Sequence, residues 1–120
     1  MTAILLNGRE LAKTMQEEIN AEVASFKAAH GVVPTIAVLR AGEDPASVSY
    51  AKAIEKAFGA RGMGFALHAL PESASQAELV DLVARMNTDP AVHGIMVQEP
   101  LPRGIDEAVV KEALSPQKDV

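Results

Sequence analysis

Three segments of the sequence carry polar and aromatic side chains that could bind a small molecule. Each directly follows a short apolar run typical of a buried strand, and the three segments are residues 41–50, 71–75 and 98–102. Tyr50 offers a ring that can stack and a hydroxyl that can donate, and Gln98 offers a neutral amide that donates and accepts. Because the carboxyl ends of parallel strands gather at one edge of a sheet, the three segments predict a ligand site at that edge.

Other kinds of site find little support in the residue types. His30, His68 and His93 are far apart and match no metal-ligand spacing, and the absence of cysteine excludes thiolate ligands and disulfides. We therefore expect no metal site. No Gly-x-Gly-x-x-Gly pattern or phosphate loop occurs, so these residues by themselves are expected to bind no dinucleotide.

Helix signals are clear at four places. Residues 9–28 carry an apolar stripe at steps of three and four, followed by Gly31 as a stop. An Asp-Pro pair at 44–45 suits the N-cap and first position of a helix running to about residue 60. A capping box at 75–78 begins the next helix, which Asp89-Pro90 ends, and a last helix starts near Asp106.

Strands alternate with these helices. The apolar runs at 35–39, 65–70 and 94–97 are short, as strands buried on both faces require. Successive parallel strands need right-handed crossovers, which place helices on both faces of the sheet. The expected fold is α/β, three-layer, with a parallel sheet of about three to four strands, forming one domain over residues 1–120.

Composition narrows the function classes. The chain has 120 residues, 48% hydrophobic and 22% charged, which is the balance of a folded domain. Its net charge of −5 and scattered basic residues argue against nucleic acid as a partner. The start lacks the pattern of a signal peptide and no segment is long and apolar enough to span a bilayer, so we expect a cytoplasmic protein without a membrane partner.

Three ordered segments resemble the methylenetetrahydrofolate dehydrogenase/cyclohydrolase family. Residues 42–50, Gly-Glu-Asp-Pro-Ala-Ser-Val-Ser-Tyr, are similar to the family's Gly-Asp-x-Pro-Ala-Ser-x-x-Tyr helix start. Residues 94–102, Gly-Ile-Met-Val-Gln-Glu-Pro-Leu-Pro, resemble its Gly-Ile-x-Val-Gln-Leu-Pro-Leu-Pro, and residues 116–120 its Pro-x-Lys-Asp-Val run. The likeness is ungapped from about residue 34 to Val120.

The resemblance implies a function. Enzymes of this family interconvert methylene-, methenyl- and formyl-tetrahydrofolate, with the folate held between an amino-terminal domain and an NADP-binding Rossmann domain. This chain resembles the first domain, so the Rossmann domain, and NADP with it, is expected beyond residue 120, and a homodimer is expected at full length. By the same resemblance, Tyr50 and Gln98 are the expected catalytic and substrate-binding residues, and Pro100 and Leu101 are expected to contact the substrate.

One departure affects the expected chemistry. The family's lysine stands four residues after the tyrosine, on the same helix face, and here that position holds Ile54. Water addition to a methenyl cation requires a group that exchanges protons, so the change argues against the cyclohydrolase step. Lys56 is the candidate to replace the family's lysine, and Lys52 also flanks Ile54. At about 100° per residue, however, Lys52 and Lys56 lie roughly 200° and 240° around the helix from Tyr50.

A second departure is Glu99, where the family has leucine, together with the unusually charged Arg40. We expect these two side chains to pair across the strand ends or to remain solvated.

Two functional readings follow from the sequence. In one, these residues are the first domain of a folate-converting enzyme. In the other, Ile54 and Glu99 mark a non-catalytic paralogue that binds a pterin or another small ligand as a regulatory module. A signalling receiver of the flavodoxin-like kind is a weak third reading, because the first strand lacks an acidic pair at its end.

Overall fold

The computed structural model describes residues 1–120, and its elements alternate between helix and strand along the chain. Their order is α1 (Gly8–His30), β1 (Thr35–Ala41), α2 (Pro45–Ala60), β2 (Gly64–Leu70), α3 (Gln76–Thr88), β3 (Gly94–Val97) and α4 (Glu107–Glu112). These bounds agree with the expected elements to within one or two residues, and α1 and β1 are each slightly longer than expected.

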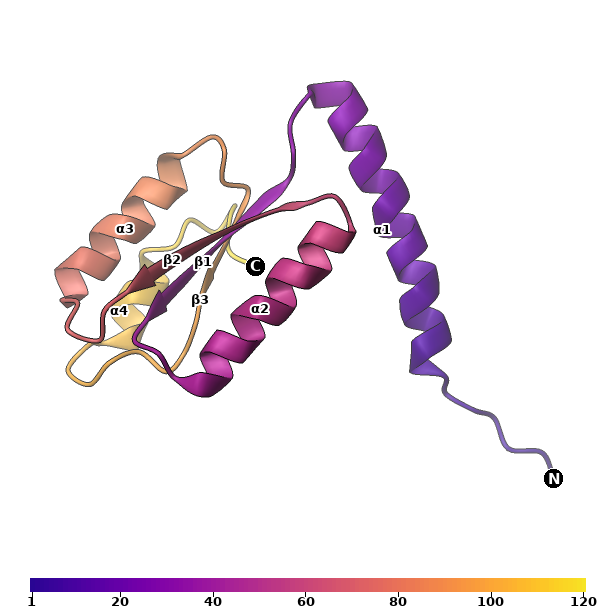
Figure 1. Ribbon diagram of the computed structural model, residues 1–120, viewed down its shortest axis with the longest axis horizontal. Helices are drawn as coiled ribbons and strands as arrows, with labels where there is room; N and C mark the ends of the chain where they lie inside the picture. The colour runs from indigo at the N-terminus through magenta and orange to yellow at the C-terminus, as the bar shows by residue number, and fades with distance from the viewer.

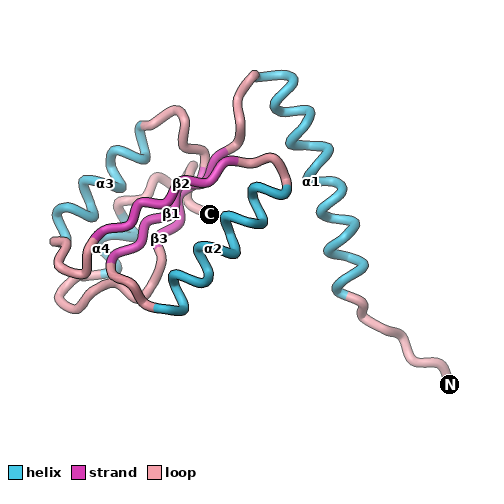
Figure 2. Tube along the Cα trace, viewed as in Figure 1, coloured by secondary structure: helices cyan, strands magenta, loops and turns pink.

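The three strands form a parallel sheet in the order β2-β1-β3, so the first strand lies in the centre. Ile36 of β1 is opposite Phe65 of β2 on one side and Gly94 of β3 on the other. Helix α2 covers one face of the sheet, and α3 and α4 cover the other (Figures 1 and 2). The expected fold class, a three-layer α/β domain with a parallel sheet, is confirmed.

Local capping chemistry explains where the helices begin. The Asp44 side chain accepts a hydrogen bond from the backbone N–H of Ser47, and Pro45 occupies the first turn of α2. Ser75 and Glu78 form a reciprocal capping box at the start of α3. Gly31 ends α1 in the left-handed region at φ 65°, a conformation that glycine adopts without steric cost.

The apolar core has two parts, one on each face of the sheet. The larger cluster lies between the sheet and α3 and α4 and includes the fully buried Leu39, Leu79 and Ile95. The smaller cluster lies beneath α2 and consists of Ile36, Val38 and Ile54, with Phe58, Phe65 and Met96 packed against it. Burial on both faces is why the β1 sequence is almost continuously apolar.

Helix α1 projects away from the layered body (Figure 1). The Cα radius of gyration is 17.1 Å, against about 14 Å expected for a compact domain of this length. Of the apolar stripe on α1 only Val23 is buried, whereas Leu11, Met15 and Ile19 are exposed. Its carboxyl end is held by an edge contact between Phe26 and His93, whose ring centroids are 6.3 Å apart. No helix in the structure combines the length and apolarity that crossing a membrane requires.

Candidate functional site

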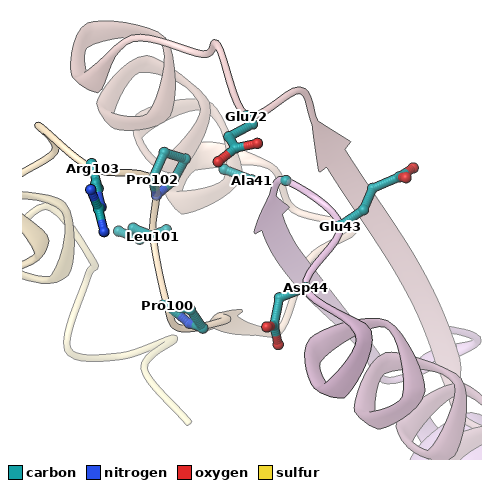
Figure 3. A pocket seen from close by; sticks show the side chains of 9 residues that line it. Ala41, Glu43, Asp44, Glu72, Pro100, Leu101, Pro102 and Arg103 are labelled. Atoms are coloured by element: carbon teal, nitrogen blue, oxygen red, sulfur yellow. The ribbon is translucent and has the colours of Figure 1, made fainter.

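The loops that follow the three strands line an open cavity of about 480 Å³ at the carboxyl edge of the sheet. The β1–α2 loop contributes residues 41–44, the β2–α3 loop contributes Glu72, and the chain after β3 contributes residues 100–103 (Figure 3). The convergence expected from the sequence is therefore present. Pro100 and Leu101, two of the expected substrate-binding residues, lie in its wall, and Leu101 is 8% exposed.

Charged groups of both signs surround the cavity. Glu72 lies between Ala41 and Pro102 in Figure 3, whereas the Glu43 side chain points outward, away from the other labelled residues. Arg103 is the one basic residue in the lining, which makes the rim predominantly acidic. The cavity thus combines the apolar surface of Leu101 and two prolines with carboxylates that can accept hydrogen bonds from ligand N–H groups.

Beneath the cavity, Ser47 and Gln98 connect the start of α2 to the chain after β3. The Ser47 hydroxyl lies 3.0 Å from the Glu99 carbonyl oxygen and 3.3 Å from the Asp44 carboxylate. Gln98 Nε2 donates to the Ser47 carbonyl at 2.9 Å, and the backbone N–H of Gln98 donates to the Leu39 carbonyl at 2.8 Å. Both side chains are buried, so this network fixes the loop that carries Pro100 and Leu101.

Gln98 leaves one acceptor unused. Its Oε1 has no hydrogen-bond partner in the chain. This oxygen is also shielded from water, because Gln98 is only 6% exposed. A buried acceptor without a donor costs about 1–3 kcal/mol. Ile54, at the position of the family's lysine, contributes no N–H that could serve this oxygen.

The structure places Ile54 in the core. Its side chain is 8% exposed and belongs to the apolar cluster with Ile36 and Val38. Tyr50, one turn earlier, is 55% exposed, so the two residues do not share an environment as the spacing suggested. The reason is geometric: residues four apart differ by about 40° around the helix. At the edge of the contact between α2 and the sheet, a rotation of this size is enough to place Tyr50 in solvent and Ile54 in the core.

The two candidate lysines lie elsewhere on α2. Lys52 lines a separate hollow with Arg40 and Glu43, and Lys56 is exposed on the outer surface of the helix. Tyr50 lines neither that hollow nor the main cavity. The structure therefore brings Pro100 and Leu101 together in the cavity wall and places Gln98 beneath them. Tyr50 stands one helical turn beyond Ser47, on the adjoining surface.

Glu99 forms an ion pair with Lys111 of α4, whereas the sequence had led us to expect either a pair with Arg40 or a solvated side chain. Hydrogen bonding to Glu99 raises the pKa of Lys111, with the Glu99 and Glu107 charges adding to the effect against desolvation. Arg40 instead donates through Nε to the Gly42 carbonyl at 3.2 Å. Neither expected alternative, an Arg40–Glu99 pair or two solvated side chains, holds for Glu99, because α4, whose position the strand sequences do not encode, supplies its partner.

The helix N-termini next to the cavity do not fit a dinucleotide. Pyrophosphate binds where free backbone N–H groups and the positive end of a helix meet it. Here Asp44 caps α2 and Asp106 caps α4, each through its carboxylate. At α3 the Ser75 hydroxyl accepts from the Glu78 N–H, and the Glu78 carboxylate accepts from the Ser75 N–H. These acidic groups would repel a phosphate placed at the start of these helices.

Ser47 and Glu72 lie at the site but were not predicted individually as site residues from the sequence. Ser47 stands three residues after the N-cap Asp44, the position at which a side chain of the first turn can face the sheet, and that spacing was the available signal. Glu72 lies in a predicted site segment, but nothing in its sequence neighbourhood distinguishes it from solvated loop residues.

A family model described as the catalytic domain of tetrahydrofolate dehydrogenase/cyclohydrolase matches residues 6–120 of the chain. The bifunctional protein FolD of Heliobacterium modesticaldum is 48% identical over 120 residues, which is all of this chain and 42% of the relative. The FolD protein of Caulobacter sp. is 46% identical over 118 residues, or 98% of this chain and 40% of the relative. The chain thus spans about two fifths of the relatives it matches.

Solved structures give the same result. The bifunctional FolD methylenetetrahydrofolate dehydrogenase/cyclohydrolase of Campylobacter jejuni aligns with a TM-score of 0.91 and 34% identity. That alignment covers 97% of this chain and 41% of the other. Because nearly the whole chain aligns, the fold described above is similar to the corresponding part of that longer protein.

Proposed function

The chain belongs to the tetrahydrofolate dehydrogenase/cyclohydrolase family, and we propose that it is the substrate-binding domain of an enzyme that interconverts methylene-, methenyl- and formyl-tetrahydrofolate. The observation that carries the proposal is the cavity at the carboxyl edge of the sheet, where the loop of residues 98–102 forms one wall. That loop is one of the three segments that resemble the family's own. Ligands of open α/β sheets bind at this edge.

In this proposal the folate lies between the cavity and Tyr50, over the first turn of α2. Tyr50 is half exposed, so its ring is free to lie against the pterin and its hydroxyl to hydrogen-bond. Pro100 and Leu101 supply apolar contact from the cavity wall. Gln98 is buried, and in this proposal its role is to hold the cavity loop to α2 through its hydrogen bond to Ser47.

The cyclohydrolase step is the weakest part of the family activity in this chain. Hydrolysis requires a group that accepts a proton from the attacking water and returns it. Ile54 has no such group, and its side chain is buried among Ile36 and Val38. Lys56 is the substitute suggested by the sequence, but it is exposed on another side of α2. We therefore propose an enzyme whose methenyl-tetrahydrofolate hydrolysis is weak.

The dehydrogenase step requires a nicotinamide cofactor, which we propose to be NADP held by a Rossmann domain outside residues 1–120. The family structure from Trypanosoma brucei was solved with NADP and an inhibitor, which supports that choice of cofactor. The acidic caps on α2, α3 and α4 are the reason to place the cofactor elsewhere. We further propose a cytoplasmic homodimer for the complete protein.

The reading as a non-catalytic pterin-binding module finds no support. The two relatives that are 46% and 48% identical are both named bifunctional proteins. Ile54 bears on one of the two activities only, because hydride transfer depends on positioning the nicotinamide against the folate carbon.

A protein limited to these 120 residues is expected to reduce no NADP in the presence of methylenetetrahydrofolate, because the chain has no site that would position the nicotinamide. The complete gene product is expected to reduce NADP at a saturable rate. Absorbance at the NADPH band measures both. Reduction of NADP by the 120-residue chain would contradict the assignment of substrate and cofactor to separate domains. Failure of the complete product to reduce NADP or NAD would contradict the proposed function.

A further inference from the structure

The carboxyl end of α3 holds the last residues of the chain through Lys118. The Lys118 ammonium donates to the Met86 carbonyl at 3.0 Å and to the Asp89 carbonyl at 2.7 Å. The final carbonyls of a helix lack partners within the helix and form the negative end of its dipole. The Met86 and Asp89 carbonyls also accept backbone N–H groups, from Asp89 and Val92, so Lys118 adds to each a charged donor, whose contact is stronger than a neutral hydrogen bond.

The backbone around Lys118 pairs with the outer edge of β3. The Ile95 N–H donates to the Lys118 carbonyl at 2.7 Å, and Asp119 forms a parallel bridge with Ile95. Val120 lies directly against Gly94, where an added Cβ would stand 3.0 Å from a Val120 methyl carbon. The terminal residues therefore extend the sheet by one short strand-like segment next to β3.

Asn87, in the last turn of α3, holds the turn that leads into this segment. Its Nδ2 donates to the Ala113 carbonyl at 2.7 Å, and its Oδ1 accepts from the Ser115 N–H at 2.9 Å. The Ser115 carbonyl in turn accepts from the backbone N–H groups of Lys118 at 2.9 Å and Asp119 at 3.0 Å, so the turn also reaches the segment that follows it. The register of residues 118–120 against β3 is set by the Lys118 side chain and the bonds of its own backbone.

This arrangement matters for the candidate site because β3 is only four residues long and leads directly into Gln98. One edge of β3 pairs with β1. Its other edge is held by the contact with residues 118–119. The loop bearing Pro100 and Leu101 begins immediately after Gln98.

We propose that Lys118 is a positioning residue of the folate site: by binding the carboxyl end of α3 it fixes residues 118–120 on β3, and through β3 it fixes Gln98 and the cavity loop. The inference rests on the proposed function, because it assumes that the cavity loop binds a folate. Lys118 does not itself touch the cavity and takes no part in the chemistry.

The test compares Lys118→Met and Lys118→Arg with the wild-type chain, and uses Lys13→Met as a matched control that removes an exposed lysine of α1, outside the cavity and its loop. Amide hydrogen exchange of Ile95 and Gln98, measured by NMR, reports the register. Titration with 5-formyltetrahydrofolate reports affinity. Thermal melting reports the fold as a whole.

In Lys118→Met, the Ile95 amide is expected to exchange roughly tenfold or more faster, as loss of a charge-assisted bond implies, and the affinity for the folate to fall by a similar factor. Amides of β1 and β2 should keep their wild-type rates. Lys118→Arg should restore both readouts, because a guanidinium can also donate to two carbonyls. Lys13→Met should leave the Ile95 exchange rate and the folate affinity unchanged.

Unchanged Ile95 exchange in Lys118→Met, with normal folate binding by the wild type, would overturn the inference. So would a loss of affinity that merely follows faster exchange at every amide, since that pattern describes a general loss of stability. If the wild-type chain binds no folate, the proposed function fails, and the role of Lys118 in folate binding fails with it. The Ile95 exchange rate then still shows whether the contact with α3 sets the register.

Discussion

Hydrolysis of 5,10-methenyltetrahydrofolate by the complete gene product is expected to be about 10²–10⁴-fold slower than by a family member that has lysine at the position of Ile54. That range is the usual contribution of a positioned proton-transfer group. Ile54 is buried and apolar. The remaining lysines of α2, Lys52 and Lys56, lie away from Tyr50 and from the cavity.

The measurement follows disappearance of the methenyl compound with and without protein, because the compound also hydrolyses spontaneously. A rate close to the spontaneous one agrees with the prediction. A robust, saturable rate would contradict it and would assign proton transfer to another residue. Lys52→Ala and Lys56→Ala variants would then identify that residue.

The substitution Ile54→Lys is expected to destabilise the chain by about 2–4 kcal/mol, because it places an amine in an apolar cluster. Ile36 and Val38 surround the side chain, and neither can accept a hydrogen bond. The one buried side-chain acceptor without a hydrogen-bond partner is Gln98 Oε1. A hydrogen bond from the new lysine to Gln98 Oε1 would reduce the cost of burying the amine. If the lysine reaches that oxygen, the destabilisation should therefore be close to about 2 kcal/mol.

Thermal or denaturant unfolding measures this effect, and Ala53→Lys is the matched control because Ala53 is exposed on the same helix. The control is expected to melt like the wild type, since lysine is a good helix former at a solvated position. Near-native stability of Ile54→Lys, together with a gain in hydrolysis, would show that this position opens onto the folate site and that the burial of Ile54 does not decide its role.

The elements were predictable from sequence because their signals are local. Asp44 and Pro45 start α2, and Ser75 with Glu78 starts α3, through bonds that span three residues or fewer. The strands are short β-branched and apolar runs between glycine and proline, and the alternation of helix and strand implies a parallel sheet. The meeting of the three loops follows from that topology alone.

The environment of single side chains was not predictable in the same way. Whether Ile54 faces a cleft or the core depends on how α2 is rotated against the sheet, which tertiary packing decides. Glu99 was expected either to pair with Arg40 or to remain solvated, but it pairs with Lys111 of a helix that comes later in the chain. The apolar stripe of α1 was visible in the sequence, whereas its exposure along most of its length follows from where the helix stands relative to the body.

NMR titration of the chain with 5-formyltetrahydrofolate tests whether the cavity at the carboxyl edge of the sheet binds a folate between residues 98–102 and Tyr50. Tyr50 is the one tyrosine and no tryptophan is present, so its ring signals are unambiguous. If the folate binds there, we expect saturable shifts of the Tyr50 ring and of the Gly42, Gln98 and Leu101 amides, with β2 unaffected. Absence of saturable shifts, or shifts confined to the opposite edge of the sheet around Phe58 and His93, would contradict it.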